Sequence, residues 1–147
     1  LLMFTFKQID TPLEKMWAKN RTRAIICEDT QGIIAYDNQK FAACALFDSF
    51  TVESCNVHLA IINPFVLRHG FLNAVCDHVF DVCKRERIFG LVPSDNRKAL
   101  KFNKHIGMTE MHTIKDAIKK DVHYVVMQMN KKDCVWRSNP ATNKEAA

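Results

Sequence analysis

The first half of the chain alternates apolar and polar positions with the spacing of β-strands. Residues 3–9 alternate in this way, and residues 32–36 and 41–50 are apolar runs separated by a short polar stretch, which predicts two strands joined by a turn. A dense apolar run over residues 57–62 ends at Asn63-Pro64 and is typical of a strand covered on both faces. The pattern predicts one early strand and then three consecutive strands.

Helical signals separate the first strand from the others. Thr11, Pro12 and Glu14 have the spacing of a capping box with proline at the first helical position, which predicts a helix start. Leu13, Met16 and Trp17 share one face of that helix. Residues 21–27 fit either a second helix or a strand.

The second half alternates helices and strands. Residues 71–86 carry apolar side chains at helical spacing, which predicts a long amphipathic helix, and residues 88–92 read as a buried strand. The apolar positions of this helix are Leu72, Val75, Cys76, Val79, Phe80 and Cys83.

The last elements are a helix and a hairpin. A helix is expected over residues 97–106, with Ser94 or Asp95 as its cap and Gly107 as its stop. Strands are expected over residues 108–115 and 122–129, joined by a long connection at residues 116–121. The order of elements predicts an α/β (α+β) fold.

At 147 residues, the chain has the length of a single domain. We expect one domain over residues 1–136 and a flexible tail over residues 137–147, with Met3 as the natural start. The apolar N-terminus breaks at Lys7 and is too short for a signal peptide or a membrane span.

Charge and cysteine content narrow the class of function. The net charge of +5 fits an anionic ligand and is too mild to indicate nucleic-acid binding. The six cysteines include no Cys-x-x-Cys pair, so we expect reduced thiols, a cytoplasmic location and no metal site.

The segment from Arg87 to Met108 carries a family resemblance. Asn96, Ala99, Gly107 and Met108 have a spacing that resembles the late core of the GNAT family, the acetyl-CoA-dependent N-acetyltransferases. The short GNAT-like proteins of bacteriophages and prophages are similar in further pieces, which here are Phe47-Asp48-Ser49-Phe50-Thr51, Ser54, His58, Asn63-Pro64, the run from Val92 to Met108, and Cys134-Val135-Trp136.

This resemblance implies a GNAT fold, with a mixed central sheet of about six to seven strands, splayed between the fourth and fifth strands, and helices on both faces. It also implies that acetyl-CoA lies in the splay. By position, the residues expected to bind it are Ile61, Ile62, Arg68, His69, Gly70, Phe71, Asn96 and Ala99. The late-helix lysines Lys98, Lys101 and Lys104 would either meet the 3′-phosphate of CoA or solvate the surface.

The sequence departs from the family pattern at two places. Anchoring the diphosphate turn on Gly70 puts Leu67 where a basic residue is usual and Leu72 where a small one is usual, so Arg68 and His69 also fit a solvated loop. Asn103 stands where many members carry a tyrosine acid. An amide donates a hydrogen bond but gives up no proton at neutral pH.

His58 is the expected general base, because it interrupts an apolar strand beside the expected acetyl group. The alternative is a hydrogen-bonded core histidine. Ser54 and Asp48 are candidate polar groups on the substrate side.

The function expected is acetyl transfer from acetyl-CoA directly to an amine, with His58 and Asn103 as the catalytic candidates. The acceptor would be a small molecule or a protein, a host protein if the source is a phage, and the protein would act alone or as a homodimer. The alternative is a non-catalytic binding or virion-associated structural protein on the same fold.

Overall fold

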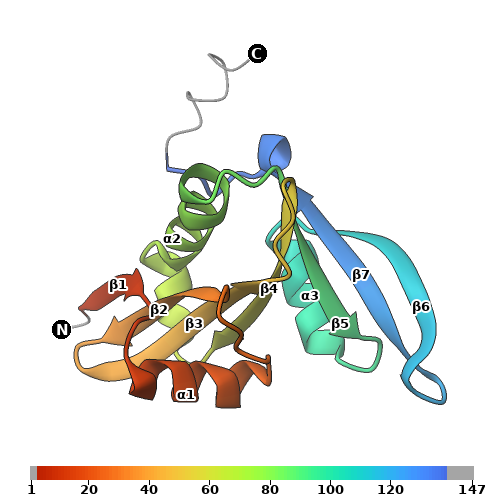
Figure 1. The fold of residues 1–147 in the computed structure, drawn as a ribbon, viewed down its shortest axis with the longest axis horizontal. Helices are drawn as coiled ribbons and strands as arrows, with labels where there is room; N and C mark the ends of the chain where they lie inside the picture. The colour runs from red at the N-terminus through yellow and green to blue at the C-terminus, as the bar shows by residue number, and fades with distance from the viewer. Residues whose placement is uncertain (1–2, 139–147) are drawn as a thin grey trace.

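A computed structural model of the chain describes residues 3–138. Its elements (Figure 1) are β1 (Phe4–Gln8), α1 (Pro12–Thr22), β2 (Gln31–Asp37), β3 (Lys40–Asp48), β4 (Ser54–Ile61), the 3-10 turn η1 (Pro64–Arg68), α2 (Phe71–Cys76), the π-helical segment η2 (Asp77–Val82), β5 (Arg87–Pro93), α3 (Arg97–His105), β6 (Thr109–Lys119), β7 (Val122–Asn130) and the 3-10 turn η3 (Lys131–Asp133).

The strands form one seven-stranded sheet in the order β1-β2-β3-β4-β5-β7-β6. All neighbours are antiparallel except β4 and β5, which run parallel. Their pairing extends only from Ser54↔Arg87 to Asn56↔Phe89, and beyond it the two strands diverge (Figure 1). The expected sheet, splayed between its fourth and fifth strands, is confirmed.

The sheet has a hydrophobic core on each face. The larger core joins the sheet to α2, η2 and α3, and the smaller one lies under α1. The expected inward positions of the long helix are buried from Leu72 to Phe80. This helix changes from α to π geometry at Asp77 and ends at Val82, short of the expected residue 86.

Helix α1 begins with the expected capping box. Thr11 Oγ1 accepts a hydrogen bond from the Glu14 N–H at 3.1 Å, and Glu14 Oε1 accepts one from the Thr11 N–H at 3.1 Å. Its inward residues are Glu14 and Ala18, whereas Leu13 is 59% and Met16 56% exposed. The face shared by these two apolar residues therefore points to solvent.

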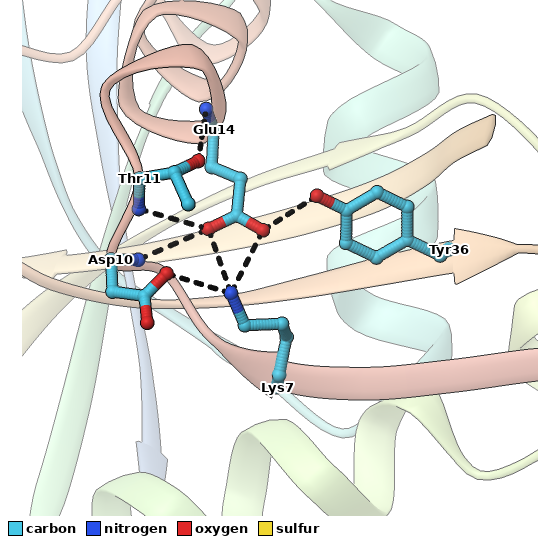
Figure 2. A network of polar contacts seen from close by, with 5 residues as sticks. All are labelled: Lys7, Asp10, Thr11, Glu14 and Tyr36. Carbon is cyan, nitrogen blue, oxygen red and sulfur yellow. Dashed lines mark hydrogen bonds and ion pairs between the residues drawn. The ribbon is translucent and has the colours of Figure 1, made fainter. Parts of the chain in front are cut away.

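The Glu14 carboxylate ties α1 to the first two strands (Figure 2). It accepts hydrogen bonds from Tyr36 Oη at 2.5 Å, from Lys7 Nζ at 3.0 Å, and from the N–H groups of Asp10 and Thr11 at 3.1 Å. Burial by itself would raise the pKa of Glu14, but these donors hold the pKa far below its usual range. A buried charge is tolerated here because it is fully hydrogen-bonded.

Of residues 21–27, which the sequence left open between helix and strand, Arg21 and Thr22 complete α1 and residues 23–27 form neither. Helix α1 ends at Thr22, and Arg23 adopts a left-handed conformation with φ 60°. Such a residue is a common helix terminator.

Two boundaries in the second half differ from the sequence expectation. The cap of α3 is Asn96, whose Oδ1 accepts from the Ala99 N–H at 3.2 Å, rather than Ser94 or Asp95. Strand β6 continues to Lys119 rather than ending at residue 115. It does so across a left-handed residue, Asp116, whose N–H donates to His123 Nδ1 at 2.9 Å.

The C-terminal segment is held against α2 and η2. Trp136 Nε1 donates to the Ile106 carbonyl at 2.7 Å, Arg137 pairs with Asp81, and the Ser138 N–H donates to Asp77 Oδ1 at 2.8 Å. These contacts reach two residues into the expected tail. The rest of that tail, residues 139–147, and the two leucines before Met3 lie outside the described residues.

The six cysteines, all within the described part of the chain, are free thiols. None of the helices between residues 3 and 138 is long and apolar enough to span a membrane.

Candidate functional site

The candidate functional site lies where the pairing between β4 and β5 ends and the two strands diverge. The Ile62 N–H bonds the Ala42 carbonyl of the neighbouring strand at 2.9 Å. Because backbone direction alternates along an antiparallel ladder, the N–H groups of Leu59 and Ile61 point away from β3. They face the side of β4 on which β5 no longer pairs after Phe89. The backbone N–H groups of Leu59 and Ile61 are therefore available to bond a ligand.

His58 and Asp48 form a pair beside this edge. His58 Nε2 lies 2.8 Å from Asp48 Oδ2, and the side chains are 31% and 18% exposed. The register Leu46↔His58 and Asp48↔Asn56 makes the two residues diagonal neighbours on adjacent strands. Both were named separately from the sequence, and the structure brings them together.

The hydrogen bond fixes how His58 presents its ring. A carboxylate only accepts, so in the neutral imidazole the proton sits on Nε2 and the lone pair on Nδ1. Among residues 3–138, Nδ1 has no hydrogen-bond partner. This arrangement leaves Nδ1 able to take a proton from a ligand.

Ser54 is engaged elsewhere. Its Oγ lies 2.9 Å from Thr51 Oγ1, and its N–H donates to the same hydroxyl at 3.0 Å. These bonds close the turn between β3 and β4. Ser54 is therefore part of the turn and is not joined to the pair of His58 and Asp48.

Asn103 lies on the other face of the sheet. A Cβ placed on Gly90 would lie 3.6 Å from Asn103 Nδ2, so the amide covers β5 just past its last pairing with β4. Gly90 belongs to the buried side of β5, whereas His58 lies on the face that carries α1. The two catalytic candidates flank the splay without touching.

The turn into α2 contains the next expected residues. Gly70 has φ +96° and precedes the first helical residue, Phe71, which is fully buried. His69 Nδ1 lies 2.8 Å from the Phe65 carbonyl oxygen, and the Arg68 guanidinium lies 6.0 Å from the Phe65 ring centre. Arg68 and His69 are exposed, and Phe71 offers only its backbone.

The two leucines that depart from the GNAT turn pattern both pack against the hydrophobic core. Leu67 packs against the larger core and Leu72 is buried within it. Both side chains stabilise the junction between η1 and α2. Neither can meet a ligand phosphate.

The remaining expected cofactor residues are spread around the splay. The Asn96 side chain is used in capping Ala99, so it positions α3. Ile61 is half-buried and Ile62 is 46% exposed at the end of β4. Lys98 and Lys101 are exposed, and Lys104 pairs with Glu110 at 2.9 Å.

Within the part of the chain that the structure describes, no group of three or more His, Cys, Asp and Glu side chains is arranged to hold a metal ion.

The fold defined by this split sheet is that of the GNAT acetyltransferases. The chain aligns over 96% of its length with 96% of the spermidine/spermine N-acetyltransferase SpeG from Vibrio cholerae, crystallised in complex with manganese ions, at a TM-score of 0.71 and 12% identity. A Desulfovibrio desulfuricans structure assigned to the GNAT family matches 88% of this chain and 99% of its own, with a TM-score of 0.70 and 9% identity.

A dodecameric form of the Vibrio cholerae spermidine N-acetyltransferase matches 88% of this chain and 94% of its own, with a TM-score of 0.70 and 11% identity. No protein-family model matches the chain, and no curated protein matches it in sequence.

Proposed function

We propose that the protein is an acetyl-CoA-dependent N-acetyltransferase that transfers the acetyl group directly to an amine. One observation carries the proposal. The pairing of β4 and β5 ends at Asn56↔Phe89, and the bonded pair of His58 and Asp48 lies immediately beyond that point. The structures that share this fold include N-acetyltransferases, which supports the same reaction class.

The residues present fit acetyl-CoA. The free edge of β4 at Leu59 and Ile61 suits the amide groups of a pantetheine arm. Arg68, His69 and the unpaired N–H groups at the start of α2 suit its diphosphate. Acetyl-CoA would supply an acetyl group activated as a thioester.

His58 acts as the general base in this proposal. Its Nδ1 takes a proton from the acceptor amine, which must be neutral to act as a nucleophile. Asp48 holds the ring in the productive tautomer and stabilises the imidazolium that forms. Attack of the amine nitrogen on the thioester carbonyl carbon would form the amide C–N bond and break the C–S bond. The CoA thiolate would leave and take a proton from solvent, and the proton on His58 would pass to solvent. Asn103, on the opposite face of the splay, carries a hydrogen-bond donor at Nδ2 and no group that can give up a proton.

Acetyl-CoA binding tests the proposal. Calorimetry with the folded protein is expected to show binding at micromolar concentrations, and native mass spectrometry of freshly purified protein is expected to show bound CoA. Absence of binding at high micromolar acetyl-CoA would reject the enzyme.

A second candidate is a binding protein that uses this fold without catalysis. It is favoured by the two leucines that replace the basic and small residues of a typical diphosphate turn: Leu67, which is partly buried, and Leu72, which is buried. This candidate predicts a stable complex with a protein partner that forms equally well without CoA.

A further inference from the structure

The π-helical segment η2 brings a histidine and a cysteine together. The Cys83 N–H donates to the His78 carbonyl oxygen, five residues back, at 2.8 Å. In an α-helix, residues five apart point about 140° away from each other around the axis. A π turn closes on the fifth residue, so the two side chains share one face. Such turns are rare and frequent at functional sites.

Three side-chain donor atoms meet at this turn. His78 Nε2 lies 3.4 Å from Cys83 Sγ. Gln31 Oε1, from the first residue of β2, lies 3.0 Å from His78 Nε2 and 3.4 Å from Cys83 Sγ. Oε1 only accepts, and the other two atoms carry one proton each at most. Two protons serve at most two sides of this triangle, so one side always lacks a hydrogen bond.

The triangle has the size of one face of a tetrahedral metal site. Metal–ligand bonds of about 2.0–2.3 Å at tetrahedral angles separate the ligand atoms by about 3.3–3.6 Å, and the sides here are 3.0–3.4 Å. Imidazole and thiolate are ligands that Zn²⁺ prefers, whereas Mg²⁺ and Mn²⁺ prefer oxygen. Because Gln31 is exposed, water can reach a fourth position.

The surroundings hold the ligands in place. The His78 ring stacks on the ring of buried Phe47, with centroids 5.4 Å apart and planes at 27°. Phe47 pairs with Gln31 in the register of β2 and β3. One strand pair therefore orients both the imidazole and the amide.

Both titrating ligands are in the state that precedes metal binding. Burial lowers the pKa of His78, so its imidazole is neutral at neutral pH, which is the form that binds metal. Burial raises the pKa of Cys83, and nearby Arg85 opposes that rise. The thiol is therefore protonated, and its proton would pass to solvent when a metal ion replaces it.

We propose that His78, Cys83 and Gln31 bind Zn²⁺, with water completing a tetrahedral shell. Two of the three protein ligands are His and Cys, and the amide oxygen is the third. None of them belongs to the residues expected to bind acetyl-CoA or to act on the amine, so the site is independent of acetyl transfer. A bound ion would join β2 to the end of η2.

Metal binding to the chelator-treated full chain tests the site. Calorimetry is expected to show a single Zn²⁺ bound per chain, with a heat that depends on the buffer because the Cys83 proton is released. Co²⁺ should give the near-ultraviolet absorption of a cobalt–thiolate bond, and Mg²⁺ should not bind. Absence of Zn²⁺ binding by the folded protein would reject the proposal.

Variants locate the ion. Cys83→Ser is expected to abolish the cobalt–thiolate absorption, and Gln31→Ala to weaken Zn²⁺ binding roughly tenfold or more. Gln31 is exposed, so its variant keeps the test valid if Cys83→Ser does not fold. Cys27→Ser, at an exposed free cysteine, is the matched control and should bind both ions like the wild type. Loss of the absorption in Cys27→Ser, or its persistence in Cys83→Ser, would place the ion on another thiol and overturn the assignment.

Discussion

The imidazole of His58 lies 2.8 Å from the carboxylate of Asp48 across two adjacent strands. The contact is made just beyond the last pairing of β4 with β5. It orients the imidazole ring, because the carboxylate holds the proton on Nε2 and leaves the lone pair on Nδ1. This is the orientation that the proposed role of His58 as a general base requires.

Replacing either residue of the pair of His58 and Asp48 is expected to slow acetyl transfer. His58→Gln should lower kcat roughly 100-fold or more, the usual contribution of a general base, and Asp48→Asn should lower it less. The KM for acetyl-CoA should stay constant, because neither side chain belongs to the expected CoA contacts. The measurement is steady-state CoA release, with His112→Gln on the exposed strand β6 as the control. Full turnover by His58→Gln would assign the base to another group.

Glu14 is expected to contribute more to stability than a typical surface carboxylate. Glu14→Ala leaves the Tyr36 hydroxyl and two backbone N–H groups without their acceptor, and should lower the free energy of unfolding by roughly 2–3 kcal/mol. Tyr36→Phe removes one bond and should cost about 1 kcal/mol.

Urea unfolding followed by circular dichroism measures both effects. Glu14→Gln is the matched variant, because its amide oxygen still accepts the capping hydrogen bonds. Its loss of unfolding free energy should lie between the losses of Glu14→Ala and Tyr36→Phe. If Glu14→Ala lowered the free energy of unfolding by less than Tyr36→Phe does, the capping bonds of Glu14 would contribute little to stability.

His78 is expected to make the fold sensitive to mild acid. Burial lowers the pKa of His78 below its ordinary value of 6.5, and Nε2 lies 3.0 Å from Gln31 Oε1. The unfolded chain then takes up the proton first. The contribution to stability is complete above pH 6.5 and declines as the pH falls toward and through the lower pKa of the folded state.

The check is the free energy of unfolding of chelator-treated protein, measured between pH 8 and pH 5. His78→Leu should flatten the decline below pH 6.5, whereas His112→Gln should leave the wild-type slope. An unchanged slope in His78→Leu would assign the acid sensitivity to other groups.

Cys134 is expected to be the more reactive of two neighbouring thiols. A hydrogen bond from Cys76 lowers the pKa of Cys134, and the same bond, together with burial, raises the pKa of Cys76. Iodoacetamide at neutral pH should therefore modify Cys134 before Cys76, because the thiolate is the reacting form.

Peptide mass spectrometry over a time course gives the order of modification. Burial raises the pKa of Cys44 and of Cys55 to about 12, so these two thiols serve as internal unreactive references. Modification of Cys76 ahead of Cys134 would reverse the assignment of donor and acceptor.

The sequence predicted the features that depend on neighbouring residues. The capping box at Thr11 and Glu14 and the glycine stop at Gly107 involve groups within a few residues, and the structure confirms both. The inward face of α1 depends on distant partners. Lys7 and Tyr36 come from β1 and β2, so a polar residue became the buried one.

Strand register explains what the sequence left open at the site. Asp48 and His58 are both visible in the chain, but their contact follows from the offset between β3 and β4. The place of Gln31 beside His78 likewise depends on the pairing of β2 with β3. Neither the alternation of polar residues nor the GNAT resemblance predicts the register of these two strand pairs.

The short ladder between β4 and β5 also has a consequence for hydrogen exchange. The amides of Leu59 and Ile61, which face the vacated side, should exchange with solvent much faster than those of His58 and Ala60, which face β3. Protection along β4 would then alternate residue by residue. A ligand that pairs with this edge would erase the alternation and identify, amide by amide, how far along the strand it lies.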